Sequence, residues 1–299
     1  MHKSAIIFGG SGGIGRVVAY FLVSSGYGVT IASRTLTQVE CTVQELTCVT
    51  PALVEQSGAD DARHTLGDTA LPNVRGQVAD VTSFESVTGV IEKHEQYFGG
   101  LDVIVNAAAL QGPIGPLWKN DPHKWFEATT TNLTGVFHVC HAGLSQMLKA
   151  QRGVIIIFSG GGAAYARPNF SAYGASKTGV LRLVETIHEE LRNACPGKIQ
   201  VYAVAPGAVR TRMTEEVLAC QDAAGERAYA EAVATDVEGG TPPEKVAELC
   251  LYLAEQRPVC LSGRLIHVNE PYREYVIHFE GKDLSDAGML RRQPYKSSE

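Results

Sequence analysis

The sequence predicts an α/β protein built on a doubly wound, mostly parallel seven-stranded sheet flanked by helices. Short apolar runs alternate with stretches of helical periodicity along the whole chain. The run at 153–158 carries no polar side chain, which is typical of a strand covered by helices on both faces. A glycine-rich loop also separates the first apolar run from the first helical pattern. We expect strands at 5–8, 28–32, 74–79, 101–105, 153–158, 199–205 and 264–268.

Composition restricts the class of protein. The 299 residues are 44% hydrophobic and 19% charged, and no linker divides them, so we expect a single domain over 1–299. No apolar run approaches the ~20 residues of a membrane helix, and no secretory signal opens the chain. A net charge of -6 without a basic cluster disfavours nucleic acid. We therefore expect a cytoplasmic protein that acts on a small molecule, with neither nucleic acid nor membrane as partner.

Metal and disulfide chemistry are not predicted. The seven cysteines include no Cys-x-x-Cys pair, and a chain of this length does not need disulfides to fold. His138 and His141 lie three apart on a probable helix, but no third ligand is evident. We expect reduced, structural cysteines and no metal site.

The glycine-rich loop predicts a dinucleotide site. Glycines let the backbone turn tightly and approach a pyrophosphate, whose charge is then stabilised by the free N–H groups of the helix that follows. A glycine loop alone is a weak signal, but its place between the first strand and the first helix makes it specific. The expected cofactor-binding residues here are Gly9, Ser11, Gly12, Gly13, Ile14 and Gly15.

The end of the second strand predicts which dinucleotide is bound. An NAD site places an acidic residue about 20 residues after the glycines, and this chain has Ser33 and Arg34 there. A guanidinium matches the oxygens of a 2'-phosphate. We therefore expect NADP(H) to be preferred over NAD(H), the alternative being that Arg34 is an ordinary exposed loop arginine.

Three further segments follow expected strands and lie where a parallel sheet binds its ligand. Asp80 and Val81 are suited to holding an adenine ring. The segment of Asn106, Ala107 and Ala108 leaves room for a ligand because its side chains are small. A turn then follows the sixth strand, and its candidate cofactor residues are Pro206, Gly207, Val209 and Thr211.

Tyr173 and Lys177 are the candidate reactive pair. Residues four apart on a helix project from one face, so the ammonium lies beside the phenol. A tyrosine titrates near pH ~10, and a cation within ~4–6 Å lowers that value. This spacing is suited to proton transfer. Any helix can carry such a pair by chance, and the nucleotide-site motifs elsewhere in the chain favour the catalytic interpretation.

Three segments are set apart from the predicted sheet. Residues 47–73 contain few large apolar side chains and are expected to form a surface insertion. Residues 212–240 are expected to form a helical lid over the substrate. The C-terminal segment 269–299 is not assigned to any element.

With these motifs in order, the chain resembles the short-chain dehydrogenase/reductase family over about residues 4–268. The resemblance implies a single Rossmann-type catalytic domain and a homodimer or homotetramer. It implies that Tyr173 donates or takes the proton, that Lys177 lowers its pKa and holds the ribose, and that Asn132 anchors a water relay. It also implies a catalytic serine, for which the candidate is Ser159, and a carboxamide-binding pair at Val209 and Thr211.

The chain departs from the family pattern at several positions. Phe8 replaces the usual threonine, and Ala107 and Ala109 stand in the Asn-Asn-Ala-Gly signature. Gly160 occupies the place of the catalytic serine, 13 residues before Tyr173. Either the glycine run bends the backbone and turns Ser159 into the pocket, which we favour, or the hydroxyl is absent.

The leading hypothesis is an NADP(H)-dependent oxidoreductase that transfers a hydride between nicotinamide and a carbonyl or secondary alcohol, with Tyr173 as general acid/base. A non-catalytic NADP(H)-binding module, or an epimerase or dehydratase on the same fold, is the alternative. The substrate is not predicted. Arg167, Arg210 and Arg212 either face an acidic substrate or are solvated loop arginines.

Overall fold

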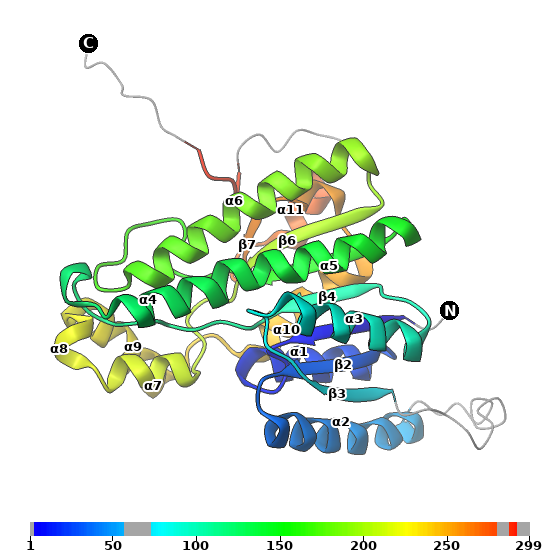
Figure 1. Cartoon of the computed structure of the whole chain (residues 1–299), viewed down its shortest axis with the longest axis horizontal. Helices are drawn as coiled ribbons and strands as arrows, with labels where there is room; N and C mark the ends of the chain where they lie inside the picture. Colours follow the sequence, from blue (N-terminus) through cyan, green and yellow to red (C-terminus); the bar gives the residue numbers. More distant parts are fainter. Residues whose placement is uncertain (1–2, 57–72, 280–286, 292–299) are drawn as a thin grey trace, which may run out of the picture.

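The computed structural model describes residues 3–56, 73–279 and 287–291. Its centre is one seven-stranded sheet in the order β3-β2-β1-β4-β5-β6-β7, with every neighbouring pair parallel (Figure 1). The predicted fold class is confirmed. The strands are β1 Ser4–Phe8, β2 Gly28–Ser33, β3 Val74–Val78, β4 Val103–Asn106, β5 Gly153–Phe158, β6 Ile199–Ala205 and β7 Leu265–His267.

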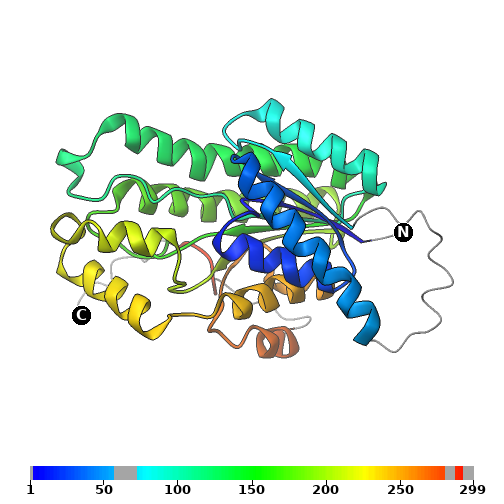
Figure 2. The same ribbon diagram turned by 90° about the horizontal axis from the view of Figure 1, so that it is seen from below.

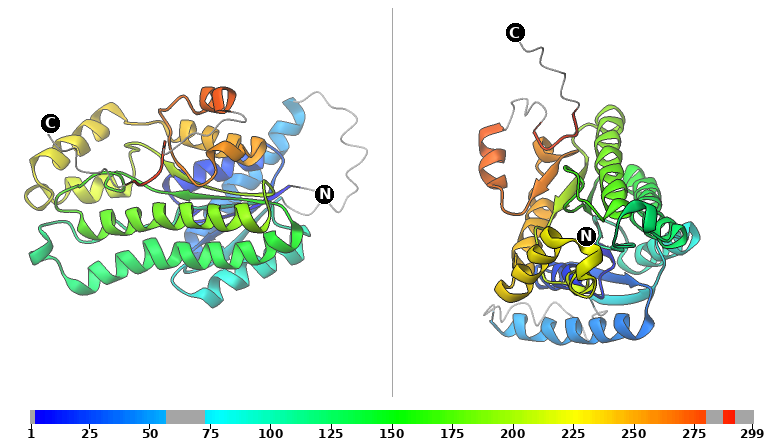
Figure 3. Two further views of the ribbon diagram at one scale, coloured as in Figure 1. Left: turned by 90° about the horizontal axis from the view of Figure 1, so that it is seen from above. Right: turned by 90° about the vertical axis from the view of Figure 1, so that its left-hand side faces the viewer.

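Helices cover both faces of the sheet, as Figures 2 and 3 show. One layer consists of α1 Gly13–Ser24, α2 Leu36–Gln56 and α10 Pro243–Gln256, and the other of α3 Phe84–Phe98, α5 Gly135–Ala150 and α6 Ser171–Ala194. Strand side chains alternate between the two layers. Val154 and Ile156 of β5 join the core beneath α1 and α10, whereas Ile155 and Ile157 join the core beneath α5 and α6. Each face of the sheet therefore has its own hydrophobic core, and each core extends over several strands.

The chain reverses its direction of winding next to β1. Strands β2 and β3 extend from one side of β1, and β4 to β7 extend from the other. In such sheets the crevice for a ligand lies beyond the carboxyl ends of the strands at this reversal. The loops after β1 and β4 meet there: the N–H of Ala107 donates to the carbonyl of Phe8 at 2.8 Å.

Three short helical segments connect β4 to α5. They are the short 3-10 turn η2 Leu117–Lys119, the helix α4 Pro122–Thr129 and the π-helical turn η3 Thr130–Thr134. The carboxylate of Asp121 caps α4 by accepting from the N–H of His123 at 2.8 Å. The π turn contains Asn132, and such turns are frequent at functional sites.

The expected lid region is helical. It folds as α7 Arg212–Leu218, α8 Gln221–Ala224 and α9 Glu226–Glu238, which Figure 1 shows in yellow at one end of the molecule. Glycines 225 and 239 have positive φ and separate these helices from their neighbours.

Two expectations about segments change. Residues 47–56 are the last turns of α2 rather than the start of a surface insertion, because α2 continues through Gln56. Of the remaining stretch, residues 57–72 lie outside the described residues. The short turn η4 Val259–Leu261 precedes β7, and the C-terminal segment beyond β7 is partly structured because it contains α11 Tyr272–Phe279. Beyond α11, the N–H of Leu265 donates to the carbonyl of Gly288 at 2.8 Å, so this part of the tail lies along β7.

Among the described residues, no helix combines the length and apolarity needed to cross a bilayer. Within the same ranges, no three His, Cys, Asp or Glu side chains gather as metal ligands would.

Candidate active site

Helix α6 carries Tyr173 and Lys177 into the protein interior. Tyr173 is 9% exposed and Lys177 is 2% exposed. Val180, Val184 and Ile187 bury one face of the same helix against the sheet, which sets the direction of its first turns. The ammonium of Lys177 lies 5.6 Å from the ring centroid of Tyr173, so the two side chains share one face as predicted.

A backbone carbonyl at the end of β5 holds Lys177. Its Nζ donates to the carbonyl of Phe158 at 2.8 Å. The buried ammonium is therefore fixed at the carboxyl end of the sheet, where the ligand crevice lies.

Asn132 lies beside α6 and is fully buried. Its Nδ2 donates to the carbonyl of Leu110 at 2.8 Å and to Oγ of Ser176 at 3.2 Å, and its Oδ1 accepts from the N–H of Leu110 at 2.8 Å. Asn132 thus joins the loop after β4 to the helix of Tyr173. Its side chain is committed to these partners rather than to Lys177.

Burial dominates the electrostatics of the pair. It raises the pKa of Tyr173 to about 12, opposed by the positive charge of Arg167. It also lowers the pKa of Lys177 to about 8. Desolvation of the phenolate therefore outweighs attraction by the neighbouring cation, and the net pKa of Tyr173 lies above its ordinary value. Arg167 is the neighbouring cation that acts on the phenol.

Ser159 and Gly160 follow β5 directly. Continued alternation with Ile155 and Ile157 would turn the Ser159 side chain toward the α6 layer, and the residue is 2% exposed. Its Oγ is buried without a hydrogen-bond partner among the described residues. A β-carbon at Gly160 would overlap Oη of Tyr173. The backbone therefore brings position 160 directly to the phenol, and a side chain there would displace it.

The glycine loop fits a dinucleotide. Gly9 has φ +75°, and a β-carbon there would overlap the backbone of Ala108, so the loops after β1 and β4 touch. Gly12 caps the N-terminus of α1, and a β-carbon there would meet nothing within 4 Å. The protein's own packing does not require glycine at this position, whereas a pyrophosphate on the helix N-terminus does. Ser11 belongs to this loop, and Ile14 and Gly15 form the first turn of α1.

The turn after β6 meets the glycine loop. A β-carbon at Gly13 would lie 3.6 Å from Cγ2 of Thr211. In the same turn, which begins at Pro206, Gly207 has φ +74° and Val209 is buried. The N–H of Thr211 donates to Oγ1 of Thr214 at the start of α7. The crevice is therefore bounded by residues far apart in the sequence.

The structure separates the roles of Ser33 and Arg34. The hydroxyl of Ser33 accepts from the N–H of Ser11 at 3.2 Å, so it holds the glycine loop against the end of β2. Arg34 is exposed and makes no hydrogen bond or ion pair with the residues that the structure describes. Its guanidinium is free to bind an anion next to the loop.

The remaining predicted cofactor residues lie at the carboxyl ends of β3 and β4. The carboxylate of Asp80 accepts from the N–H and hydroxyl of Thr82 at 2.9 and 2.8 Å, and Val81 is buried against α5. Asn106 is 2% exposed, and its Oδ1 accepts from the N–H of Ala108 at 3.2 Å. Its Nδ2 is buried without a partner in the described part of the chain, which leaves an unused donor at the carboxyl end of β4. Ala107 is half-buried next to it.

An apolar cluster around Tyr173 was missed by sequence reasoning. It joins Phe170 to side chains of the α7–α9 segment, with Ile114 and Met213 at its edge. The buried members are Phe170, Tyr173, Val217, Ala224, Ala228 and Ala232. Helical periodicity in 212–240 was the available signal, but periodicity alone does not identify which surface a helix covers.

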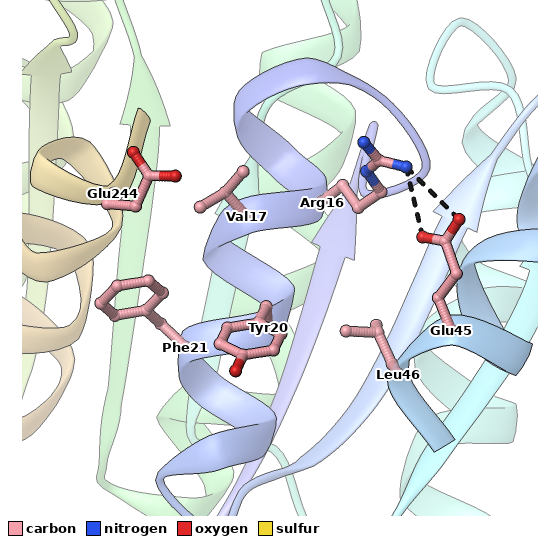
Figure 4. A pocket seen from close by; sticks show the side chains of 7 residues that line it. All are labelled: Arg16, Val17, Tyr20, Phe21, Glu45, Leu46 and Glu244. Carbon is pink, nitrogen blue, oxygen red and sulfur yellow. Dashed lines mark hydrogen bonds and ion pairs between the residues drawn. The ribbon is translucent and has the colours of Figure 1, made fainter. Parts of the chain in front are cut away.

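Figure 4 shows a pocket on the other side of the sheet, between α1, α2 and α10. Its walls include Val17, Phe21 and Leu46, and Arg16 pairs with Glu45 at 3.2 Å on one side. Because α6 covers the opposite face, this pocket lies apart from Tyr173 and adds nothing to the site.

A glycine loop after β1 and a buried Tyr–Lys pair at the end of β5, on the same edge of a parallel sheet, define a nicotinamide-dependent oxidoreductase of the short-chain type. The sequence profile of the short chain dehydrogenase family matches residues 3–222. The chain belongs to this family.

Relatives span nearly the whole chain. It is 30% identical over 269 residues to a 3-oxoacyl-[acyl-carrier-protein] reductase of Haemophilus influenzae, an alignment that covers 89% of this chain and 96% of the relative. It is 29% identical to the enzyme of the same name from Staphylococcus aureus, over 90% and 97% of the two chains.

Solved structures also match most of the chain. An actinorhodin polyketide ketoreductase variant crystallised with NADPH superposes with a TM-score of 0.72 at 26% identity, over 89% of this chain and 95% of that one. An NAD⁺-bound xylitol dehydrogenase superposes with a TM-score of 0.70 at 22% identity, over 89% and 96%, and this likeness concerns the fold alone.

Removing the buried ammonium is expected to change how stability depends on pH. Lys177 has a pKa of about 8 when folded, below the ordinary lysine value of 10.5, so between these values the unfolded chain binds more protons than the folded one. The free energy of unfolding then rises with pH, by about 1.4 kcal/mol per pH unit at most. Lys177→Met should lack this contribution. The measurement is urea unfolding of both proteins from pH 7 to 10.

Lys149→Met, which removes an exposed positive charge from α5, is the control. Its curve should follow the wild type. Parallel curves for wild type and Lys177→Met would show that Lys177 is not held with a lowered pKa.

Proposed function

We propose that this enzyme transfers a hydride between NADP(H) and a carbonyl or secondary alcohol, with NADP(H) preferred over NAD(H). The observation that carries the proposal is the buried pair of Tyr173 and Lys177 at the carboxyl end of β5, the edge of the parallel sheet at which the glycine loop follows β1. The cofactor, when bound, supplies or accepts the hydride.

The roles of the chain's own residues follow from their positions. Tyr173 gives its proton to the substrate oxygen, or takes it back in the reverse direction. A pKa of about 12 keeps the phenol protonated at neutral pH, so it is ready to act as a donor for reduction. Lys177 holds positive charge beside the developing phenolate, and it would donate to the ribose of the bound cofactor.

Asn132 positions this pair. Its amide links Leu110 to Ser176, three residues after Tyr173, so it sets the distance between the β4 loop and α6. Ser159 offers a buried hydroxyl without a partner among the described residues, which is suited to steadying the substrate oxygen. The helices α7 to α9 exclude water from the phenol as a lid.

The glycine loop, the β3 and β4 ends, and the turn around Val209 and Thr211 would hold the dinucleotide. The names of the relatives support this assignment: two are 3-oxoacyl reductases, and one solved ketoreductase contains NADPH. The NAD⁺ in the xylitol dehydrogenase means that the fold alone does not select the cofactor. Arg34 is the local argument for NADP(H).

Oxidation of NADPH with a panel of ketones, followed at 340 nm, tests the proposed activity. Consumption of NADPH that depends on both enzyme and ketone supports it. Binding of NADPH without consumption on any ketone would instead favour a cofactor-binding module. By likeness to the family we also expect a homodimer or homotetramer, which light scattering in solution measures.

Replacing Arg34 with alanine is expected to erode the preference for NADPH. A charge-assisted bond is worth ~1.5–3 kcal/mol, so the ratio of NADPH to NADH affinity should fall on the order of 10- to 100-fold. Calorimetric titration of both cofactors into both proteins measures it. Arg192→Ala on α6, an exposed arginine paired with Glu189, is the control. Equal affinities of the wild type for NADPH and NADH would contradict the assignment.

A further inference from the structure

The arginines around the substrate side of the site differ in their partners. Arg210 pairs with Asp236 at 2.8 Å, Arg212 with Glu216 at 3.1 Å, and Arg227 with Glu231 at 3.0 Å. Each of these guanidinium groups is already neutralised within the 210–240 region. Arg167 is half-buried, and its guanidinium makes no hydrogen bond or ion pair with any residue that the structure describes.

Arg167 lies next to the reactive phenol. Its guanidinium carbon is 4.2 Å from the ring centroid of Phe170. That ring is 1% exposed and belongs to the same apolar cluster as Tyr173. The positive charge of Arg167 is also close enough to lower the pKa of Tyr173 against the effect of burial. A cation stacked on Phe170 therefore lies in the neighbourhood of the Tyr173 phenol.

The loop that carries Arg167 is fastened through Asn169 to two other segments. The N–H of Gly115 donates to the carbonyl of Asn169 at 2.9 Å, and Nδ2 of Asn169 donates to the carbonyl of Ala224 in α8 at 3.1 Å. The stem of Arg167 packs against Gly162, where a β-carbon would lie 3.3 Å from its Cβ. The guanidinium is thus held in place before any substrate binds, which reduces the entropy lost when an anion binds.

We propose that Arg167 binds a carboxylate of the substrate, so that the enzyme acts on oxo acids rather than on neutral ketones. This inference rests on the proposed carbonyl reduction at Tyr173. One guanidinium balances the single charge of a carboxylate, and its planar fork matches the two oxygens. The apolar side chains of Phe170, Met213 and Val217 then contact the carbon chain between the carboxylate and the carbonyl.

The alternative role for Arg167 is electrostatic alone. A charge that only adjusts Tyr173 would affect acid and ester substrates equally and would shift the pH profile of turnover. A carboxylate-binding role affects only the acids. Pairs of substrates that differ in that charge therefore separate the two roles.

The test compares 2-oxo-, 3-oxo- and 5-oxohexanoate with their methyl esters. The wild type, Arg167→Gln, Arg167→Lys and the control Arg227→Gln are titrated calorimetrically as complexes with NADP⁺, in which no hydride is available to reduce the ketone. We expect at least one acid to bind the wild type on the order of 10- to 100-fold more tightly than its ester. Arg167→Gln should remove that preference, Arg167→Lys should keep part of it, and Arg227→Gln should keep all of it.

Turnover with NADPH is measured in parallel on the same pairs. Loss of the acid preference in kcat/KM for Arg167→Gln, with the ester rate unchanged, supports the proposal. An acid preference that survives in Arg167→Gln, or a wild type that prefers no acid over its ester, overturns it. Because binding to the NADP⁺ complex needs no reaction, tight acid binding without NADPH consumption would refute the proposed function and leave the carboxylate site standing.

Discussion

Tyr173→Phe is expected to reduce kcat on the order of 10²–10⁴-fold while leaving the affinity for NADPH nearly unchanged. The variant removes the proton donor and keeps the ring that packs with Phe170 and Val217. It does not touch the glycine loop or Arg34, where the phosphates would bind. Steady-state kinetics on a ketone that the wild type reduces, together with calorimetric titration of NADPH, measures both quantities.

Tyr202→Phe is the matched control for this experiment. Tyr202 is also fully buried, and its hydroxyl donates to the carbonyl of Pro258 at 3.2 Å, but it lies in the core on the other side of the sheet. We expect this control to lose some stability and to retain kcat. A Tyr173→Phe variant with the wild-type kcat would refute the assignment of Tyr173 as general acid/base.

Ser159→Ala is expected to reduce kcat on the order of 10²–10³-fold, as loss of an oxyanion donor does. Its Oγ is buried without a partner among the described residues, so a substrate oxygen would satisfy it. The affinity for NADPH should not change. Kinetics and cofactor titration, as for Tyr173→Phe, distinguish these outcomes.

Gly160→Ser decides between the two candidate positions. A β-carbon at 160 would overlap Oη of Tyr173, so we expect this variant to displace the phenol and to lose activity. A misplacement of about 1 Å costs roughly 10²-fold in rate. If Ser159→Ala instead has no effect and Gly160→Ser increases kcat, the catalytic hydroxyl is absent from this enzyme.

The sequence by itself determined the fold. Apolar runs such as Gly153–Phe158 predict buried strands, and the stripe of Val180, Val184 and Ile187 predicts a helix, because each pattern repeats with the period of one element. The glycine loop and the spacing of Tyr173 and Lys177 are equally local. These features could be assigned before any long-range contact was known.

Only the tertiary structure decided the environment of the site. The apolar pattern at 47–56 did not predict that α2 continues through Gln56. The pKa of Tyr173 depends on desolvation by residues of α7 to α9, which are distant in the sequence. The same packing leaves the guanidinium of Arg167 without an acidic partner among the described residues, whereas Arg210 forms an ion pair with Asp236. Burial and charge pairing arise where separate segments meet, and no periodicity within one segment reports which others will cover it.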